Sequence, residues 1–344
     1  MAEYHFQLPQ ITELTLPQQA ALNETRPIAL SGGPGTGKSV VSLWRHISNC
    51  QNQKRSFLLT YTSSLSTYLT ACCSTQNPDA AANIDRFHKG RERADNETWD
   101  EIIIDEAQDL PVDYYQGLSS CVSYGVDDSQ MLYPEYGSSC EELKALFPDN
   151  ADYVLDRNFR STQRIMSFAQ VAFPDAYIPQ NIIAGLSDNV GQWPVLLITH
   201  CPDLWCEGEE RYASSNYKQT KAVLRIIQEF RTGSHNIAIL LPFRKDVETF
   251  GDILQANGIT DFSIYCDNNE RFPDGCKTIK DLHITTFKSA KGWSLTPSYS
   301  PTFISSRKFA VHTMRSGKTI TWLSPGHAAT FISFPVMICR NLNQ

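Results

Sequence analysis

Eight consecutive residues, 32 to 39, have the composition and spacing of a loop that binds phosphate. The sequence Gly-Gly-Pro-Gly-Thr-Gly-Lys-Ser fits the pattern GxxxxGK[ST] and follows a short apolar run that predicts a strand over 27–30. Its glycines allow backbone N–H groups to point at phosphate oxygens, and a helix that begins at Lys38 adds its N-terminal dipole. The glycines in question are Gly32, Gly35 and Gly37. We predict that Lys38 holds the β- and γ-phosphates of a nucleotide and that Ser39 ligates Mg²⁺.

A second apolar run, predicted as a strand over 101–105, ends in two adjacent carboxylates, Asp105 and Glu106. In an open parallel sheet, ligands bind at the carboxyl ends of the strands. Asp105 can hold Mg²⁺ through water, and Glu106 can polarise an attacking water. Two acids after a core strand are common by themselves. About 65 residues after a phosphate loop, they predict a site of nucleotide hydrolysis.

The elements that must position these groups follow from the hydrophobic pattern. Short apolar runs predict strands over 57–60, 195–199, 237–241 and 282–286. Amphipathic spacing predicts helices from Lys38 towards Asn49, over 216–230 and over 246–256. Strands that alternate with helices in this way predict an α/β fold with a parallel sheet.

Composition narrows the class of protein further. The chain has 344 residues, enough for about two domains, and 41% of them are hydrophobic. Its net charge of −7 argues against a protein that coats nucleic acid by bulk electrostatics. The ten cysteines form no CxxC pair and no zinc-ligand spacing, which favours buried thiols in a reducing, cytoplasmic setting. Neither a signal peptide nor an 18-residue apolar stretch is present, so we expect no membrane partner.

Taken in order, these motifs and five further blocks resemble the UvrD/Rep-type helicases of superfamily 1. The run Asp105-Glu106-Ala107-Gln108-Asp109 after the phosphate loop carries the resemblance first. The further blocks lie at 14–22, 59–65, 124–130, 155–162 and 284–292. The resemblance covers about 85% of the chain. It implies a P-loop NTPase made of two RecA-like lobes, with ATP and Mg²⁺ as ligands.

The resemblance also implies roles for single residues. Gln18 would read the adenine base and Phe159 would stack on it. Gln130 would sense the γ-phosphate and Arg160 would reach it. With Lys38, Asp105 and Glu106, these residues would make up the ATP site.

Single-stranded nucleic acid, DNA by resemblance, is the implied partner. Contacts are expected at Thr60, Thr286 and Lys288, which lie in the strand-binding and coupling blocks. The larger relatives have a Trp-Arg pair after the residue equivalent to Gln130, and this chain does not. Tyr133 or Tyr136 could stack on a base instead, or either could be a packed surface aromatic.

Spacing sets the expected domains. About 65 residues from Lys38 to Asp105 and about 125 from Arg160 to Thr286 leave no room for the large inserted subdomains of full-size relatives. We therefore predict a first lobe over 1–155 and a partial second lobe over 156–293. Residues 294–344 are predicted to be an aberrant, poorly ordered tail.

The tail departs from the rest in composition. Residues 282–344 contain no Asp or Glu, where the chain's average would give about seven. Codons read one base out of frame can restore the family's Glu-Phe-Asp after position 292. The same frame can restore its last motif, Tyr-Val-Ala-Leu-Thr-Arg-Ala-Arg, over 320–328. A frameshift and a divergent natural tail are the two interpretations. Because the chain as written lacks the arginine of the last motif, we predict weak or absent ATP hydrolysis for it; if the tail is natural, catalysis without that motif has to be tested directly.

The function expected from these features is an ATP-dependent motor of helicase type that moves on single-stranded nucleic acid. Two alternatives remain open. One is a catalytically inactive remnant that still binds ATP through its first lobe. The other is a nucleotide-gated switch that acts with a protein partner and without nucleic acid.

Overall fold

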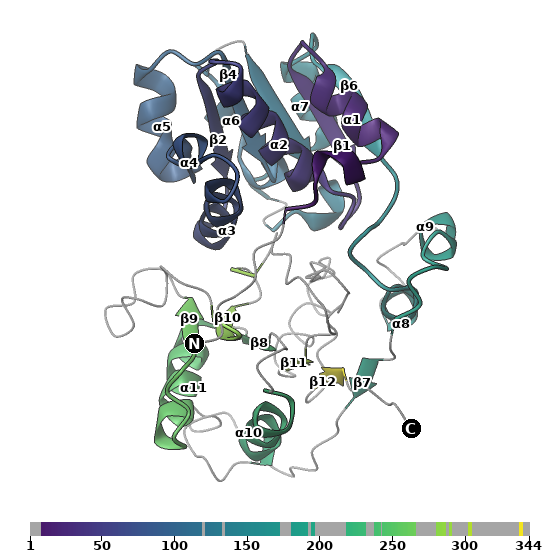
Figure 1. The fold of residues 1–344 in the computed structure, drawn as a ribbon, viewed down its shortest axis with the longest axis vertical. Helices are drawn as coiled ribbons and strands as arrows, with labels where there is room; N and C mark the ends of the chain where they lie inside the picture. The colour runs from purple at the N-terminus through teal and green to yellow at the C-terminus, as the bar shows by residue number, and fades with distance from the viewer. Residues whose placement is uncertain are drawn as a thin grey trace. The chain divides into compact units, whose positions relative to one another are not determined.

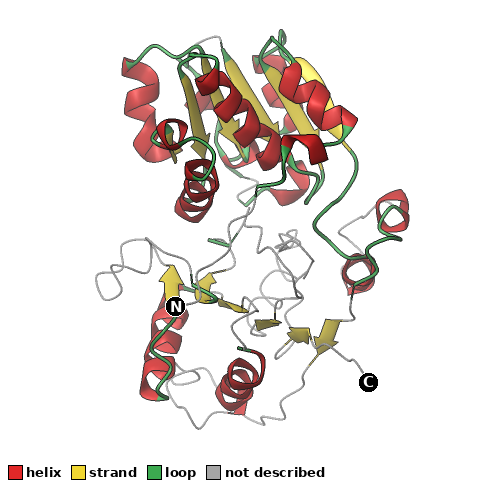
Figure 2. Cartoon of the chain, viewed as in Figure 1, coloured by secondary structure: helices red, strands yellow, loops and turns green. Residues whose placement is uncertain are grey.

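The fold is described from a computed structural model. The structure describes residues 8–118, 121–132, 135–172, 180–191, 194–196, 218–231, 237–241, 243–265, 280–286, 289–290, 302–304 and 337–339. The chain divides into two compact units, one over Phe6–Arg160 and one that begins at Ser161. Each unit contains helices and strands in alternation (Figures 1 and 2).

The first unit is built on a six-stranded sheet in which every strand pairs in parallel with its neighbours (Figure 1). Its strands, in spatial order, are β3 (Ile84–Arg86), β2 (Ser56–Thr60), β4 (Glu101–Asp105), β5 (Val122–Val126), β1 (Ile28–Gly32) and β6 (Ala151–Leu155). The strand before the phosphate loop, β1, is separated from the Asp-Glu strand, β4, by β5. The carboxyl ends of β1, β4, β5 and β6 therefore lie at one edge of the sheet.

Helices cover both faces of this sheet. They are α1 (Leu16–Asn23), α2 (Lys38–Gln51), α3 (Ser63–Ser74), α4 (Pro78–Ala81), α5 (Phe87–Asn96), α6 (Val112–Tyr115) and α7 (Cys140–Leu146). Alternate residues of β1 belong to different cores: Ala29 packs with α5, α6 and α7, whereas Leu30 packs with α1 and α2. Burial on both faces explains why β1, β2 and β4 appear in the sequence as continuous apolar runs.

The predicted α/β fold with a parallel sheet is confirmed in this unit. The strand predicted over 101–105 has those bounds, and the helix from Lys38 extends to Gln51. Three strands were not predicted: β3, β5 and β6. The unit extends to Arg160, whereas the lobe boundary predicted from sequence falls at 155; residues just beyond β6 pack on the phosphate loop, as described below.

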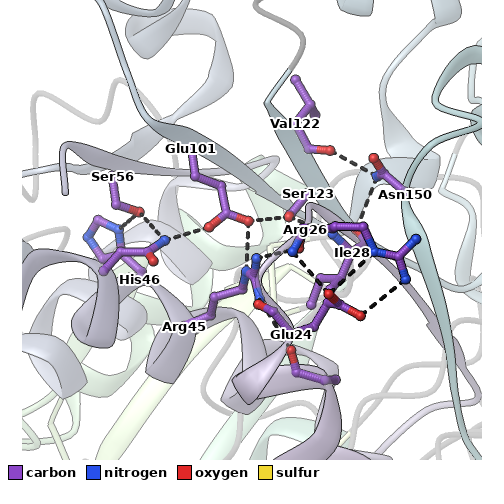
Figure 3. Close-up of polar contacts among 12 residues, drawn as sticks. Glu24, Arg26, Ile28, Arg45, His46, Ser56, Glu101, Val122, Ser123 and Asn150 are labelled. Carbon is purple, nitrogen blue, oxygen red and sulfur yellow. Dashed lines mark hydrogen bonds and ion pairs between the residues drawn. The ribbon is translucent and has the colours of Figure 1, made fainter. Parts of the chain in front are cut away.

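A buried polar network ties the amino ends of the strands together (Figure 3). Arg45 of α2 donates from Nε to Glu101 Oε1 at 2.7 Å, and both side chains are buried. The remaining guanidinium nitrogens donate to the carbonyls of Ala21, Glu24 and Arg26. Glu101 also accepts hydrogen bonds, from the side chains of Asn49 and Ser123. This network lies at the edge of the sheet opposite the phosphate loop.

Replacement of Glu101 by glutamine is expected to lower the unfolding free energy of the first unit by about 3–5 kcal/mol. The variant would leave the buried Arg45 guanidinium without its counter-charge. Urea denaturation measures the change. Arg26→Ala is the control, because Arg26 pairs with Glu24 at the surface and should leave the midpoint unchanged. A Glu101→Gln midpoint equal to that of wild type would contradict the role given to this pair.

The second unit contains a smaller four-stranded parallel sheet. In spatial order its strands are β11 (Thr302–Ile304), β8 (Ile237–Leu241), β10 (Leu282–Thr286) and β9 (Ser263–Tyr265). Its described helices are α8 (Gln163–Ala172), α9 (Gln180–Ala184), α10 (Lys218–Phe230) and α11 (Arg244–Ala256). The apolar stripe of α10, with Val223, Ile226 and Ile227, packs in one core with α11, β8 and β10. The predicted strands over 237–241 and 282–286 are observed with those bounds.

A two-stranded antiparallel pair joins β7 (Pro194–Leu196) to β12 (Met337–Cys339). β7 overlaps the strand predicted over 195–199, whose last three residues lie outside the described residues. β11 and β12 fall within the stretch predicted as an aberrant tail, and the other residues of 294–344 lie outside the described ranges. The frameshift interpretation therefore stays a prediction, to be tested on the coding sequence.

A buried histidine in the second unit predicts a pH-dependent stability. The Lys280 backbone N–H donates to Ser263 Oγ at 2.9 Å, so the Ser263 hydroxyl can donate to His283 Nδ1, 2.7 Å away. Burial lowers the pKa of His283 from 6.5 to about 3. Below about pH 6.5, His283 is protonated in the unfolded chain but stays neutral in the folded chain. Stability should be full above that pH and fall by up to about 1.4 kcal/mol per pH unit towards pH 3. The free energy of unfolding, measured between about pH 3 and pH 7, should change less steeply with pH in His283→Gln than in wild type. Equal pH dependence in the two proteins would contradict the assignment.

Candidate nucleotide-binding site

The phosphate loop joins β1 to α2, and Lys38 is the first residue of that helix. Its ammonium donates to the carbonyls of Gly32 and Gly33 at 2.6 and 3.0 Å and lies 3.3 Å from Asp127 Oδ2. Three glycines of the loop have positive φ: Gly32, Gly35 and Gly37. The Lys38 side chain is buried with only 7% of its surface exposed, so its charge is concentrated on the loop. A phosphate placed there would exchange with the contacts that Lys38 now makes.

Asp105 ends β4 beside the first turn of α2. A Cβ built on Gly125 of β5 would lie 3.2 Å from Asp105 Oδ1 and 3.7 Å from Lys38 Cβ. Glycine at this position therefore allows the carboxylate to lean across β5 towards the helix that starts at the phosphate loop. Asp105 is 1% exposed, which makes it a buried carboxylate within the site.

Glu106 has a backbone conformation that few non-glycine residues adopt. Its φ is 59° and its ψ is 44°, in the left-handed region. Its carboxylate Oε2 accepts a hydrogen bond from Gln108 Nε2 at 2.6 Å. Strained backbone of this kind is found at sites where a side chain must be aimed. The turn after β4 thus fixes a carboxylate that could orient water.

Asp127 follows β5 and joins three polar groups of the site. Its Oδ2 accepts from Gln130 Nε2 and lies 3.3 Å from Lys38 Nζ. Its backbone N–H donates to Gln108 Oε1 at 3.0 Å. Lys38, Glu106 and Gln130, which the sequence predicts to act on one nucleotide, are therefore linked through two buried residues, Asp127 and Gln108.

The segment after β6 packs directly on the phosphate loop. Asn158 Nδ2 donates to the Pro34 carbonyl at 2.8 Å, and the Phe159 N–H donates to the Gly35 carbonyl at 2.9 Å. A Cβ at Gly35, where φ is +73°, would lie 2.8 Å from Arg160 Cβ. Residues 158–160 therefore belong to the first unit, and Phe159 and Arg160 start beside the loop.

Gln18, the residue predicted to read adenine, is buried against the loop. Its Nε2 donates to the Thr36 carbonyl at 3.0 Å, and its Oε1 accepts from the Thr15 N–H at 2.9 Å. A carboxamide has two donors and two acceptor positions, so one of each remains for a base. Phe159 is 41% exposed, with the Arg157 guanidinium 5.2 Å from its ring centre. Base reading by Gln18 and stacking by Phe159 stay predictions.

The predicted nucleic-acid contacts are placed unevenly. Thr60 ends β2, and its side chain is wholly buried. A bound nucleic-acid strand would therefore contact the residues around Thr60 rather than the Thr60 side chain. Thr286 ends β10, is 8% exposed, and accepts a hydrogen bond from the backbone three residues on. Tyr133 and Lys288 lie outside the described residues. Tyr136 is 71% exposed. The strand contacts therefore stay predictions.

The residues present fit a magnesium ion. Asp105 and Ser39 supply a carboxylate and a hydroxyl, the hard oxygen donors that Mg²⁺ prefers. The space left by the missing side chain of Gly125 brings the Asp105 carboxylate to the first turn of α2, which contains Ser39. Across the part of the chain that the structure describes, no three His, Cys, Asp or Glu side chains gather at one point. An ion held by one carboxylate and one hydroxyl would take its other ligands from phosphate and water, and would neutralise phosphate charge.

Sequence reasoning gave no role to Gln108, Asp127 or Asn158, although all three fall within the quoted blocks. Each lies one to three residues after a strand of the sheet, and each is at most 7% exposed. A polar side chain just after the carboxyl end of a strand was the available signal. Their partners, up to 124 positions away, were not readable from the sequence.

A parallel sheet in which an interior strand, β1, runs into a GxxxxGKS loop, with carboxylates at or just after the carboxyl ends of the next two strands, β5 and β4, defines a P-loop NTPase fold. No protein-family model and no curated protein sequence matches the chain. Within the described residues, no helix is long and apolar enough to cross a bilayer.

Several solved structures are similar to the chain. One is the Sulfolobus solfataricus SWI2/SNF2 ATPase core in complex with double-stranded DNA, with 13% identity over 91% of this chain and 93% of that one, at a TM-score of 0.31. Another is the Pyrococcus furiosus Hef helicase domain, with 11% identity, 85% and 90% coverage and a TM-score of 0.33. A DEAD-box helicase bound to single-stranded RNA and UDP-BeF has 12% identity, 83% and 63% coverage and a TM-score of 0.45. At these values the likenesses decide neither activity nor ligand, which must follow from the site itself.

Proposed function

We propose that this protein is the core of an ATP-dependent motor of helicase type. The observation that carries the proposal is the meeting of four segments at one edge of the sheet: 32–39, 105–108, 127–130 and 158–160. A phosphate loop alone serves many nucleotide-binding proteins. A fixed carboxylate and an arginine beside the same loop add the groups that phosphoryl transfer requires.

In this proposal each residue acts on one part of ATP. Gln18 and Phe159 bind the base, and Lys38 binds the β- and γ-phosphates. Arg160 and Gln130 contact the γ-phosphate, and Glu106 orients the attacking water while Asp105 and Ser39 hold Mg²⁺. The finer assignment to the UvrD/Rep type and the preference for DNA are supported by the order of the sequence motifs alone.

ATP binding without turnover is the second candidate. Two observations support this candidate. The described site lies wholly within Phe6–Arg160, and the last arginine motif of the resembled family is missing from the chain as written. Such a chain would bind ATP through the first unit and release it unchanged.

The test is whether nucleotide and strand are coupled. ATP affinity is measured with and without a single-stranded oligodeoxythymidine, and oligomer affinity with and without ATP. A motor core should show a coupling factor different from one: the strand should change the ATP affinity. Linkage requires that ATP change the oligomer affinity by the same factor, which checks the two measurements against each other. Tight ATP binding that no strand alters would overturn the motor and assign the chain to a switch or an inactive remnant.

A further inference from the structure

The Asn158 side chain links the segment after β6 to the phosphate loop, because its amide nitrogen bonds the loop and its amide oxygen bonds the backbone of the segment. Asn158 is 6% exposed. Its Nδ2 donates to the Pro34 carbonyl at 2.8 Å, and its Oδ1 accepts from the Arg160 backbone N–H at 2.8 Å. A single planar carboxamide thus spans the loop and the residue that carries the predicted γ-phosphate arginine.

A second, backbone link makes this attachment rigid. The Phe159 N–H donates to the Gly35 carbonyl at 2.9 Å, next to the bond on Pro34. Two hydrogen bonds from adjacent residues to adjacent carbonyls fix both the position and the direction of the segment. The backbone of Arg160 therefore has little freedom relative to the loop.

Gly35 explains how the segment comes so close. Its φ of +73° belongs to the left-handed region, and a Cβ there would lie 2.8 Å from both Asn158 Oδ1 and Arg160 Cβ. The loop glycine therefore has a use besides presenting N–H groups to phosphate. It leaves the space into which Asn158 and Arg160 pack.

We propose that Asn158 is a positioning residue that sets Arg160 against the phosphate loop and thereby determines the preference for ATP over ADP. The inference rests on the proposed function, because it requires Arg160 to meet the γ-phosphate. ADP lacks that phosphate, so a displaced Arg160 costs affinity for ATP and leaves affinity for ADP nearly unchanged. A side chain that served only stability would change both affinities together.

The experiment uses the full 344-residue chain with Mg²⁺. Displacement of a fluorescent methylanthraniloyl-ADP by ADP and by the non-hydrolysable ATP analogue AMP-PNP gives the two affinities and their ratio. The variants are Asn158→Ala, Arg160→Ala and the double variant. Asn150→Ala is the matched control, because Asn150 donates to the Val122 and Ile28 carbonyls at the opposite edge of the sheet (Figure 3).

Arg160→Ala is expected to reduce the AMP-PNP preference by about tenfold or more, the range of a charge-assisted contact. Asn158→Ala should give a similar loss, and the double variant should lose no more than Arg160→Ala, since the two residues act as one unit. Asn150→Ala should keep the wild-type ratio. Where Asn158→Ala fails to fold, Asn158→Ser keeps a polar group but is too short to span both partners, and it should show the same loss.

Equal weakening of both nucleotides by Asn158→Ala, or losses that add in the double variant, would overturn the inference. So would an unchanged ratio in Arg160→Ala. These outcomes leave nucleotide binding by the wild-type chain intact. Failure of the wild-type chain to bind either nucleotide would instead overturn the proposed function, and the inference with it.

Discussion

Replacement of Lys38 by alanine is expected to weaken ATP binding by about 10²- to 10³-fold. Two losses combine. The phosphates lose a buried cation, and the Asp127 carboxylate, 3.3 Å from that cation and itself buried, is left facing them. Truncation of one partner of a buried charge pair typically costs 2–5 kcal/mol, largely because the other charge remains unpaired. Displacement of a fluorescent nucleotide measures the affinity.

Lys144→Ala is the matched control for this substitution. Lys144 belongs to the same unit and pairs with Asp152 at 3.1 Å, but the two side chains are 42% and 56% exposed. Exposed pairs contribute little, so nucleotide affinity and stability should match those of wild type. A Lys38→Ala chain that keeps its fold by circular dichroism and binds ATP as tightly as wild type would contradict the phosphate site.

Restoration of the alternative reading frame is expected to have the largest effect on catalysis. A chain whose frame is corrected between codons 288 and 330 would regain Glu-Phe-Asp and the Tyr-Val-Ala-Leu-Thr-Arg-Ala-Arg motif. An arginine that completes the charge clamp on the γ-phosphate is worth about 10³ to 10⁵ in turnover. Steady-state ATP hydrolysis with single-stranded oligodeoxythymidine should rise by a factor in that range.

The corrected chain carrying Lys38→Ala is the control and should show no turnover above background. Sequencing of the coding DNA from an independent template decides whether the corrected frame is the natural one. Equal, strand-stimulated turnover in the corrected and the present chain would contradict the prediction that the present tail impairs hydrolysis.

Much of the first unit could be predicted because its signals are local. The loop at 32–39 contains its whole pattern in eight residues, and β4 contains three isoleucines, ends at Asp105 and is followed by Glu106. The parallel sheet followed from strands that alternate with helices. These features depend on neighbours in sequence, so no tertiary contact had to be known.

The strands that were not predicted are those whose pattern is set by tertiary contacts. β5 contains Ser123 and Gly125, which weaken a strand pattern. In the structure, Ser123 hydrogen bonds to Glu101, and Gly125, which has no side chain, leaves space for the Asp105 carboxylate. β6 is an edge strand whose alternate residues are exposed, Val154 among them, so it lacks a continuous apolar run.

Positioning residues were the part of the site that sequence could not supply. Asp127 and Gln108 look like ordinary polar residues after core strands until their bonds to Lys38 and Glu106 are seen. Asn158 contacts Pro34, which lies 124 positions earlier. Only the parallel order of the sheet, which places β6 beside β1, brings these residues together.

Equilibrium binding of ATP with Mg²⁺ to the wild-type chain tests the central claim most directly. Isothermal titration should show one site per chain, with an affinity that falls at least about a hundredfold in Lys38→Ala. Absence of saturable ATP binding by the folded wild-type chain, or binding that Lys38→Ala leaves unchanged, would contradict the claim that this sheet edge is a nucleotide site.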